Sequence, residues 1–472
     1  MLSDDVLLNV FDLYRNSHDY SYRPVWGWHV LVHVCQRWRQ VIFTSPRRLN
    51  LQILCTDRTP VKTNLCIWPA FPIVVHCNSF RGISPEGNVH AALEHPDRVC
   101  YVKVDVKGPK MAKIVALLQE PFPVLKRLEI LVKAVYPPIL TAELLGGSAP
   151  SLRHIYLRGV SFPAFPSFLL TTCNLVTLTF HDVPMTGCIS PEVVVVGLAA
   201  LTRLKTLNIG FKWPAPYRYQ RPPPPVTRIV LPALTSFLFL GPWDYVEDLV
   251  AQIDSPQLDV IRVDYSNHLI DASVTQVSKF VDRSLGPKST LFKHARVSIH
   301  SDLISFTLYR HGIHPPSDWH SAKTIISCQG IGGQVSHVSQ VLCQFSATLA
   351  AVVHLELDQV VESRTWEVLG GVDWLHLFRQ FPAVQMMHVS RQLASFVAHA
   401  LEDVTGETAA ELLPSLDLIS LEEEPESSVE EIKFVAARRL SDRPVTVVDS
   451  RKEFDERVAS YISKSENVLS RY

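Results

Sequence analysis

The sequence predicts an α/β protein in which a short helical segment is followed by a long array of stacked strand-and-helix repeats. Three observations predict this fold class. Apolar side chains in the first fifty residues recur at helical spacing, and from about residue 99 onward a pattern of the form apolar-x-x-apolar-x-apolar recurs instead. Hydrophobic residues make up 47% of the 472 residues and charged residues 19%, which is typical of a folded globular chain.

The first helix is predicted over residues 3–14. Ser3 can cap the first backbone amides, and Asp4 and Asp5 stand where the helix dipole favours negative charge. One face of this helix is apolar and consists of Val6, Leu7, Val10, Phe11 and Tyr14. A second amphipathic segment follows a loop that contains Pro24, and Pro46 marks a short third turn. The apolar side of the second segment consists of Trp28, Leu31, Val32, Cys35 and Trp38.

The repeated strand pattern has a period in the twenties. Its early copies, separated by about 23 to 30 residues, begin at Val99, Leu125, Leu152, Leu175, Leu204, Leu234 and Leu258. Weaker and less evenly spaced copies begin at Phe292, Val352, Val384 and Leu416. Such a period with such a strand is typical of an irregular leucine-rich-repeat solenoid, which has a curved parallel sheet and outer helices.

The repeats depart from the leucine-rich-repeat consensus in one respect. The consensus has Asn or Cys three residues after the last apolar strand position, where the side chain satisfies backbone groups in the turn. In this sequence those places hold Lys133, Val160, Val183 and Lys212. An ordinary α/β domain with several similar strands is therefore the alternative, and the regular spacing favours the solenoid.

Two inserts and a distinct carboxyl end complete the pattern. Residues 221–225 (RPPPP) are predicted to be a stiff polyproline loop, and the acidic residues 422–431 a solvated loop. Capping boxes at Ser428 and at Ser450 each predict a helix, and residues 445–448 between them predict a final strand. The two helices are expected to cover the apolar end of the array.

Charge and cysteine usage exclude several classes of function. The net charge is -1, so no overall basic field is present to hold nucleic acid or an anionic membrane. The nine cysteines are odd in number, scattered and never spaced as CxxC, which favours free thiols in a reducing compartment. No secretory signal is visible, and the longest apolar stretches, such as residues 193–201, fall far short of a membrane span. A cytoplasmic or nuclear location is expected.

No catalytic, metal or cofactor motif emerges from the sequence. His29 and His33 have a spacing that could chelate a metal, but no third ligand is evident. Residues 330–333 (GIGG) lack the later glycine and the lysine of phosphate loops. No nucleophile elbow and no recognisable catalytic cysteine are present. We therefore expect no cofactor and no enzymatic activity.

The amino-terminal residues resemble a known family, the F-box proteins. The resemblance lies in residues 2–11 (LSDDVLLNVF) and 31–42 (LVHVCQRWRQVI), against a family pattern of Leu-Pro-x-Glu-Val-Leu-x-x-Ile-Phe followed by a Cys-x-x-Trp helix. Ser3 stands where the family usually has Pro, and the loop over residues 16–26 is longer than the common spacing. Trp28 and residues 64–73 (NLCIWPAFPI) are similar to the connector of the F-box proteins that are numerous in mushroom-forming fungi.

This resemblance implies a three-helix module that binds the Skp adaptor of a cullin-based ubiquitin ligase. The division it implies is an F-box over residues 1–50, a connector over 51–98, the repeat array over 99–427, and carboxyl-terminal helices with a strand over 428–472. The adaptor would cover apolar surface that short helices cannot bury alone. The expected adaptor-binding residues are Leu2, Val6, Leu7, Val10, Phe11, Leu31, Cys35 and Trp38. Alternatively, the helices form only a small cap on the solenoid. The core of that cap would then consist of Leu7, Phe11, Leu31, Cys35 and Trp38.

The strand residues between the apolar positions should share the concave face of the sheet, because neighbouring strand residues alternate sides. A protein target with an acidic segment is the expected ligand of this face. The candidate substrate-binding residues are Lys126, Arg127, Arg153, His154, Tyr156, Lys205 and Arg262. Plain solvation of these strand residues is the alternative.

Together these features predict a substrate receptor that holds a protein target near a charged ubiquitin-conjugating enzyme. A repeat-based interaction scaffold outside any ubiquitin ligase is the competing class. A hydrolase would require a concave pocket in which a nucleophile is hydrogen-bonded to a base.

Overall fold

The computed structural model divides the chain into two compact units. The first comprises residues 1–189 and 196–204, and the second comprises residues 190–195 and 205–472. The structure describes residues 2–16, 27–56, 60–78, 86–134, 136–184, 187, 189–212, 227–265, 275–285, 292–299, 303–309, 324–329, 342–359, 371–402, 404, 411–421 and 444–448.

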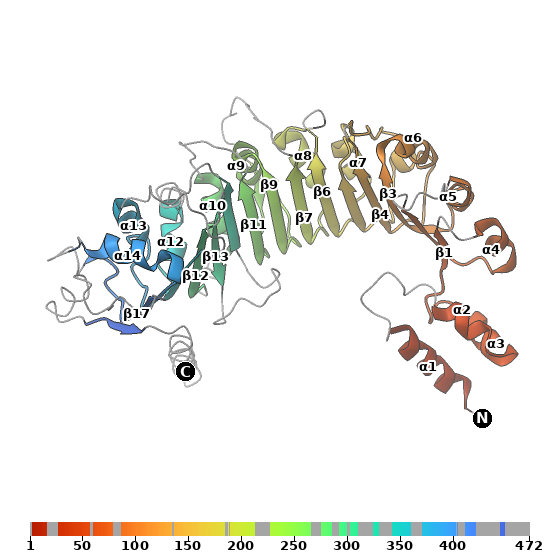
Figure 1. The fold of residues 1–472 in the computed structure, drawn as a ribbon. Helices are drawn as coiled ribbons and strands as arrows, with labels where there is room; N and C mark the ends of the chain where they lie inside the picture. Colours follow the sequence, from red (N-terminus) through yellow and green to blue (C-terminus); the bar gives the residue numbers. More distant parts are fainter. Residues whose placement is uncertain are drawn as a thin grey trace. The chain divides into compact units, whose positions relative to one another are not determined.

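Three helices begin the first unit: α1 (Asp4–Asn16), α2 (Gly27–Val32) and α3 (Gln36–Thr44) (Figure 1). Ser3 caps α1 as predicted, because its Oγ accepts a hydrogen bond from the Val6 N–H at 3.4 Å. The second amphipathic segment is two helices and not one, since a turn over residues 33–34 separates α2 from α3. The placement of Cys35 on an apolar face was wrong. Its side chain is exposed, and its Sγ caps α3 by accepting the Trp38 N–H at 3.4 Å.

The first unit continues with a parallel sheet whose strands lie in chain order. Each strand pairs in parallel with the strand before it, so a crossover connection joins each pair of neighbouring strands. Figure 1 shows α5, α6 and α7 on one side of these strands. The strands are β1 (Ile53–Thr56), β2 (Ile73–Asn78), β3 (Val99–Lys107), β4 (Arg127–Lys133), β5 (His154–Arg158) and β6 (Thr177–Val183). The intervening helices are α4 (Val61–Ile67), α5 (Glu86–Leu93), α6 (Gly108–Leu117), the 3-10 turn η2 (Leu144–Gly147) and α7 (Phe165–Leu170).

The parallel pairing starts earlier in the chain than residue 99. Strands β1 and β2 lie within residues 51–98, the predicted connector, and β2 pairs directly with β3. Their sequences are apolar on both sides, with Ile73, Val74 and Val75 all buried, so they lack the alternation by which the later copies were found. The array therefore has two more strands at its amino end than the repeat pattern indicates.

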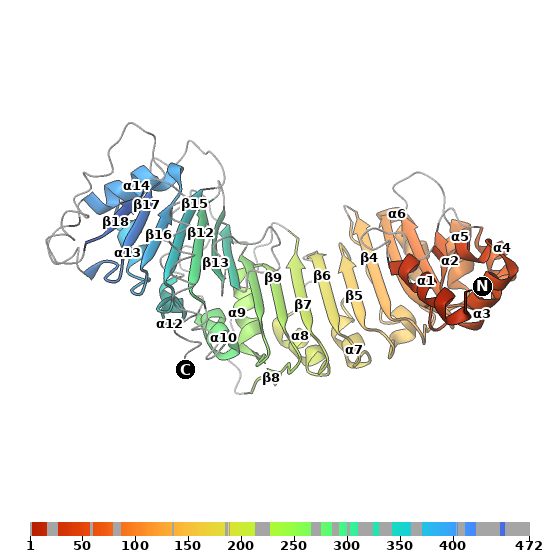
Figure 2. The same ribbon diagram turned by 90° about the horizontal axis from the view of Figure 1, so that it is seen from below.

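The second unit carries the remaining strands. Their order across the sheet is β7, β9, β11, β14, β13, β12, β15, β16, β17, β18, and Figure 2 shows β15 to β18 beside one another. The strands are β7 (Thr206–Phe211), β9 (Ser236–Gly241), β11 (Val260–Tyr265), β12 (His294–Ile299), β13 (Leu303–Tyr309), β14 (Thr324–Gln329), β15 (His354–Gln359), β16 (Met386–Val389), β17 (Leu418–Leu421) and β18 (Thr446–Val448), with β8 (Ile229–Val230) and β10 (Ile253–Asp254) paired separately. The helices are α8 (Pro191–Leu198), which contains the boundary between the units, α9 (Trp243–Ala251), α10 (Thr275–Leu285), η5 (Cys343–Phe345), α12 (Ser346–Leu349), α13 (Gly371–Phe378) and α14 (Arg391–Glu402).

The expectation of a wholly parallel sheet was wrong at one place in the second unit. Strand β13 runs antiparallel to both β12 and β14, and β14 pairs in parallel with β11. The chain thus crosses from β11 to β12 and then fills the space between them with two returning strands. This insertion accounts for the long spacing between the copies that begin at Phe292 and Val352.

Every predicted copy of the strand pattern from Val99 to Leu416 carries a parallel strand, and the predicted final strand is β18, paired with β17. The helices predicted after Ser428 and Ser450 lie outside the described residues, as do residues 221–225, 330–333 and 422–431. In this alternation of parallel strands and outer helices the chain resembles a leucine-rich-repeat protein.

The repeat positions form the core of each unit. In the copy at Leu125, the side chains of Leu125, Leu128 and Ile130 are all fully buried, and each such residue contributes about 1.5–3 kcal/mol by leaving water. Of the four positions that depart from the consensus, Val160 and Val183 are buried and pack as apolar residues, whereas Lys133 and Lys212 are exposed. Among the described helices, none is long and apolar enough to cross a bilayer.

Candidate functional site

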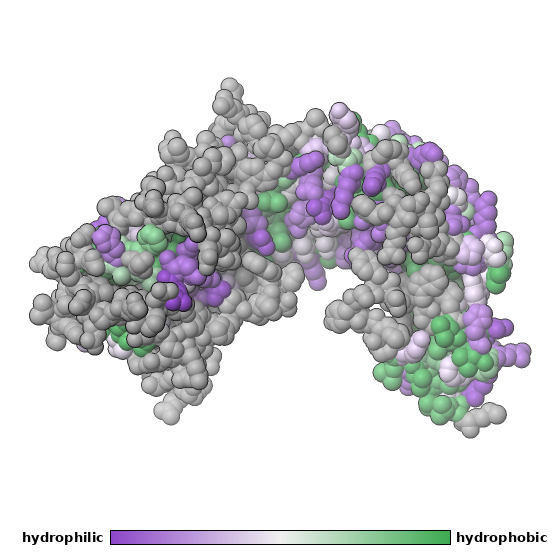
Figure 3. Space-filling model, in the orientation of Figure 1, coloured by the Kyte–Doolittle hydropathy of each residue, from purple (hydrophilic) through white to green (hydrophobic). Residues whose placement is uncertain are grey.

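An apolar stripe runs along the outside of α1. It consists of Leu2, Val6, Val10 and Leu13, whose side chains are between 42% and 69% exposed. Their spacing of three or four residues places Val6, Val10 and Leu13 on one face of the helix, and Leu2 lies just before its first turn. Figure 3 shows hydrophobic residues gathered over the helices α1 to α3, where Val30 and Val34 are also exposed. Contiguous exposed apolar surface is a common feature of interaction sites.

The opposite side of α1 is buried within the helical module. Leu7 and Phe11 are enclosed, and the Phe11 ring meets the Trp38 ring edge to face with 4.9 Å between centroids. Leu31 of α2 is buried as well. The residues predicted to bind an adaptor are thus divided: Leu7, Phe11 and Leu31 form the module's own core, Trp38 is half-buried, and Leu2, Val6, Val10 and Cys35 lie at the surface.

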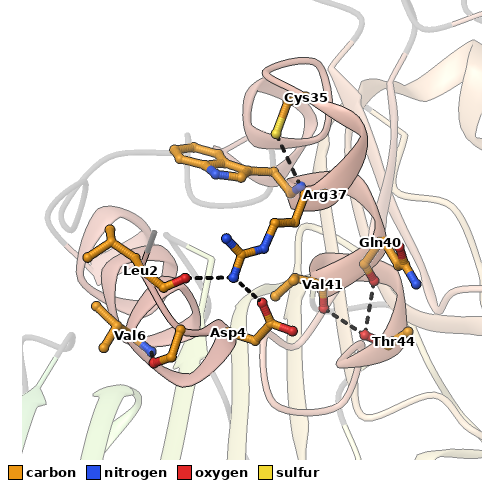
Figure 4. A network of polar contacts seen from close by, with 10 residues as sticks. Leu2, Asp4, Val6, Cys35, Arg37, Gln40, Val41 and Thr44 are labelled. Carbon is orange, nitrogen blue, oxygen red and sulfur yellow. Dashed lines mark hydrogen bonds and ion pairs between the residues drawn. The ribbon is translucent and has the colours of Figure 1, made fainter.

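Polar contacts hold α1 against α3 (Figure 4). The Arg37 guanidinium of α3 donates to the Leu2 carbonyl oxygen at 2.6 Å and to Asp4 Oδ1 at 2.7 Å. Arg48, which follows α3, donates to Asn9 Oδ1 at 2.6 Å. Each exposed pair contributes no more than about 1 kcal/mol. Their effect is geometric, because they fix the rotation of α1 and so keep its apolar stripe outward.

An aromatic cluster joins the helical module to the first strands of the sheet. Trp28 of α2 lies 5.3 Å from Trp68 and 5.6 Å from Phe71 between ring centroids, and Phe43 of α3 lies 5.9 Å from Phe71. The Trp28 indole N–H also donates to the Gln52 carbonyl oxygen at 3.0 Å. The segment around Trp68 therefore packs against the helical module through aromatic contacts.

Polar residues line the strand face of the first unit, between the buried apolar positions. The strand register places Tyr101, Arg127, His154 and Thr177 in one lateral row across β3 to β6. The next row consists of His76, Lys103, Glu129, Tyr156 and Thr179, starting from β2. We call the surface formed by these two rows the strand face.

Glu129 is the centre of this strand face and is only 6% exposed. Its carboxylate accepts the Tyr101 hydroxyl at 2.9 Å, the Lys103 Nζ at 3.0 Å and the Arg127 Nε at 2.6 Å. Burial by itself raises the pKa of Glu129, but the hydrogen bonds from Lys103 and Tyr101 and the charge of Arg127 outweigh it. The pKa therefore lies below its ordinary value, and Glu129 is an anion that its neighbours neutralise.

The structure brings together five of the seven residues predicted to bind a substrate. Lys126, Arg127, Arg153, His154 and Tyr156 all lie on β4, β5 or the residues just before them in the first unit. Lys205 and Arg262 belong to the second unit, where Arg262 Nε donates to Asp264 Oδ2 at 2.8 Å. Burial lowers the pKa of His154, and the charges of Arg127 and Arg153 lower it further, so His154 is neutral at physiological pH.

The sequence reasoning missed Tyr101 and Lys103, which complete the cluster around Glu129. They alternate with the buried Val102 and Val104 of the first predicted strand. The period-2 alternation of that strand was a sufficient signal to place them on the same face. Among the described residues no group of three or more His, Cys, Asp or Glu side chains could hold a metal ion.

No protein-family model matches the chain, and neither does any curated protein. Solved structures do match, among them the leucine-rich repeat-containing protein LegL7 from Legionella pneumophila. The identity is 12%, the match covers 84% of this chain and 99% of that chain, and the TM-score is 0.26. A TM-score this low supports no conclusion about fold or function. The resemblance to leucine-rich-repeat proteins rests instead on the strand order, the repeat period and the burial described above.

Proposed function

We propose that this chain is the substrate-recognition subunit of an SCF-type ubiquitin ligase, a complex of a Skp-type adaptor, a cullin and an F-box protein. The observation that carries the proposal is the exposed apolar stripe of α1, Leu2, Val6, Val10 and Leu13. Two further observations support it. Residues 2–11 and 31–42 resemble the F-box, and Arg37 and the aromatic cluster around Trp28 hold the helices as a defined module.

In this proposal the two surfaces have separate tasks. The helices α1 to α3 bind the adaptor and, through it, the cullin, while the strand face binds a protein target. The chain makes and breaks no bonds itself and uses no cofactor. It raises the effective concentration of the target's lysines near a charged ubiquitin-conjugating enzyme. Such a ligase would work in the cytoplasm or the nucleus.

The test is adaptor binding by the full chain and by a variant with Val6→Asp and Val10→Asp. Both valines are nearly half exposed, so the substitutions should leave the module folded. Burying each valine under an adaptor contributes about 1 kcal/mol, and burying an unpaired carboxylate there costs several kcal/mol more. We expect the variant to lose at least about a hundredfold in affinity for a purified Skp-type adaptor, measured by biolayer interferometry.

The matched control is Val196→Asp on α8, another exposed valine on a helix, which should bind the adaptor like the unmodified chain. The proposal fails if the unmodified chain does not bind the adaptor, or if the α1 variant binds as well as the control. Protein targets recovered with the chain in the absence of adaptor and cullin would favour the alternative, an interaction scaffold outside any ubiquitin ligase.

A further inference from the structure

Three basic residues lie at or just before the amino ends of β4 and β5. We call Lys126, Arg127 and Arg153 the basic strip. The Arg153 N–H donates to the Lys126 carbonyl oxygen at 2.8 Å, so the two residues are direct neighbours across adjacent strands. Arg127 follows Lys126 in the chain and pairs in register with His154, the residue after Arg153. Adjacent strands are about 4.8 Å apart, so the three residues lie close enough for one short segment of a partner to span their positions.

The basic strip carries a surplus of positive charge. Within the described part of the chain, the exposed side chains of Lys126 and Arg153 form no ion pair. The nearby carboxylate, Glu129, is buried and already accepts Tyr101, Lys103 and Arg127. Glu129 therefore pairs with Lys103 and Arg127 and leaves the charges of Lys126 and Arg153 without a carboxylate partner among the described residues. The surplus is local, because the whole chain has a net charge of -1.

Arg127 is held in place before any ligand arrives. Its Nε and Nη2 both lie 2.6 Å from Glu129 Oε1, and its guanidinium lies over the Tyr101 ring, 5.2 Å from the centroid. The side chain is nevertheless 53% exposed, so part of the guanidinium remains open to a partner. A guanidinium fixed in this way loses little conformational entropy when it binds a carboxylate.

The charges at the carboxyl ends of these strands are more nearly balanced. There Arg158 is paired with Asp182 at 2.6 Å, and Asp105 adds a carboxylate near the exposed Lys107 and Lys133. Tyr156 lies next to Glu129 in the strand register. A ligand that matches this distribution is anionic where it passes the amino ends of these strands.

We infer that the basic strip binds a short acidic segment, rich in Asp and Glu, of a partner protein. This inference deepens the proposed function by giving the class of target, and it rests on that function only in making the partner a ubiquitination substrate. Carboxylates suit a site whose fixed element is one Arg127 guanidinium flanked by two separate cations. Nucleic acid would need a much longer basic track than three residues on a chain without net positive charge.

The test uses the full chain and fluorescein-labelled decaglutamate in a fluorescence anisotropy titration at about 50 mM salt, where screening is weak. Decaglutamine serves as the neutral probe. We expect Lys126→Glu with Arg153→Glu to weaken decaglutamate binding at least about tenfold. Arg127→Lys keeps the charge but loses the two-point contact with Glu129, and should weaken binding several-fold, roughly threefold to tenfold.

The matched control is Lys62→Glu with Lys113→Glu, which makes the same change of charge on the exposed surfaces of α4 and α6. This control should bind decaglutamate within about twofold of the unmodified chain. The inference is overturned if decaglutamate binds no better than decaglutamine, or if the control loses as much affinity as the strip variant. It is also overturned if only a phosphoserine peptide or an oligonucleotide binds.

Failure of this inference is distinguishable from failure of the proposed function. The strip variant Lys126→Glu with Arg153→Glu should still bind the Skp-type adaptor, and the α1 variant Val6→Asp with Val10→Asp should still bind decaglutamate. Peptide binding without adaptor binding by the unmodified chain would refute the ligase role and leave the acidic-segment site standing. Adaptor binding without peptide binding would refute the site alone.

Discussion

Replacing Glu129 with glutamine removes the charge that holds three donors of the strand face together. Glu129 is buried and accepts Tyr101, Lys103 and Arg127 at 2.6 to 3.0 Å. Breaking a fully buried charge cluster costs about 3–5 kcal/mol. Lys103 is 20% and Arg127 53% exposed, so water can solvate part of each cation after the change. We therefore expect the free energy of unfolding to fall by about 2–3 kcal/mol.

The assay is chemical unfolding of the full chain at several pH values. Because the pKa of Glu129 is lowered in the folded state, its stabilisation is complete above the ordinary carboxyl pKa of 4.5 and is lost as the pH falls through the lowered value. The difference between the unmodified chain and Glu129→Gln should be constant near neutral pH and shrink below about 4.5.

The control for this prediction is Glu120→Gln, since Glu120 is an exposed carboxylate after α6 in the same unit. It should change the free energy of unfolding by less than about 0.5 kcal/mol. An unchanged unfolding midpoint for Glu129→Gln at neutral pH would refute the reasoning, as would a difference of the same size at every pH.

Three further results are expected from other parts of the chain. Gly159→Ala should cost about 2–4 kcal/mol, because φ is +69° there and a Cβ would collide with the Val132 carbonyl oxygen; an unchanged melting temperature would contradict this. Burial raises the pKa of Cys55 to about 12, so iodoacetamide at about pH 8 should label the exposed Cys173 first, and equal labelling rates by mass spectrometry would be evidence against it. Burial and the neighbouring His294 lower the pKa of His354 to about 3. Because His354 in the unfolded chain takes up a proton near pH 6.5, the free energy of unfolding should fall by up to about 1.4 kcal/mol per pH unit below that value. The variant His354→Gln should show a smaller dependence of the free energy of unfolding on pH in this range.

Much of the fold could be predicted because its signal is local. The apolar residues at Leu125, Leu128 and Ile130, and their equivalents in later copies, are buried in strands as the pattern indicated. The repeat pattern did not predict strands β1 and β2, because their buried residues run consecutively. It did not predict β13 either, because the alternating residues Ile304, Phe306 and Leu308 do not follow the repeat. A short apolar run is compatible with several structures until its neighbours are known.

The candidate sites show the same division. Helical spacing alone placed Val6 and Val10 with Leu7 and Phe11, but only packing decided which pair is enclosed and which is exposed. A turn after α2 then gave Cys35 a capping role in place of an apolar one. Helix periodicity defines an apolar face without saying how far that face is covered.

The sequence by itself determined the strand-and-helix repeat, the side of each strand on which its polar residues lie, and the apolar face of the first helix. Only the tertiary structure decided that Tyr101, Lys103 and Arg127 converge on Glu129. The reason is register: a repeat fixes which face a side chain takes, whereas the residue it meets on the next strand depends on the intervening turn and helix, whose lengths vary from copy to copy.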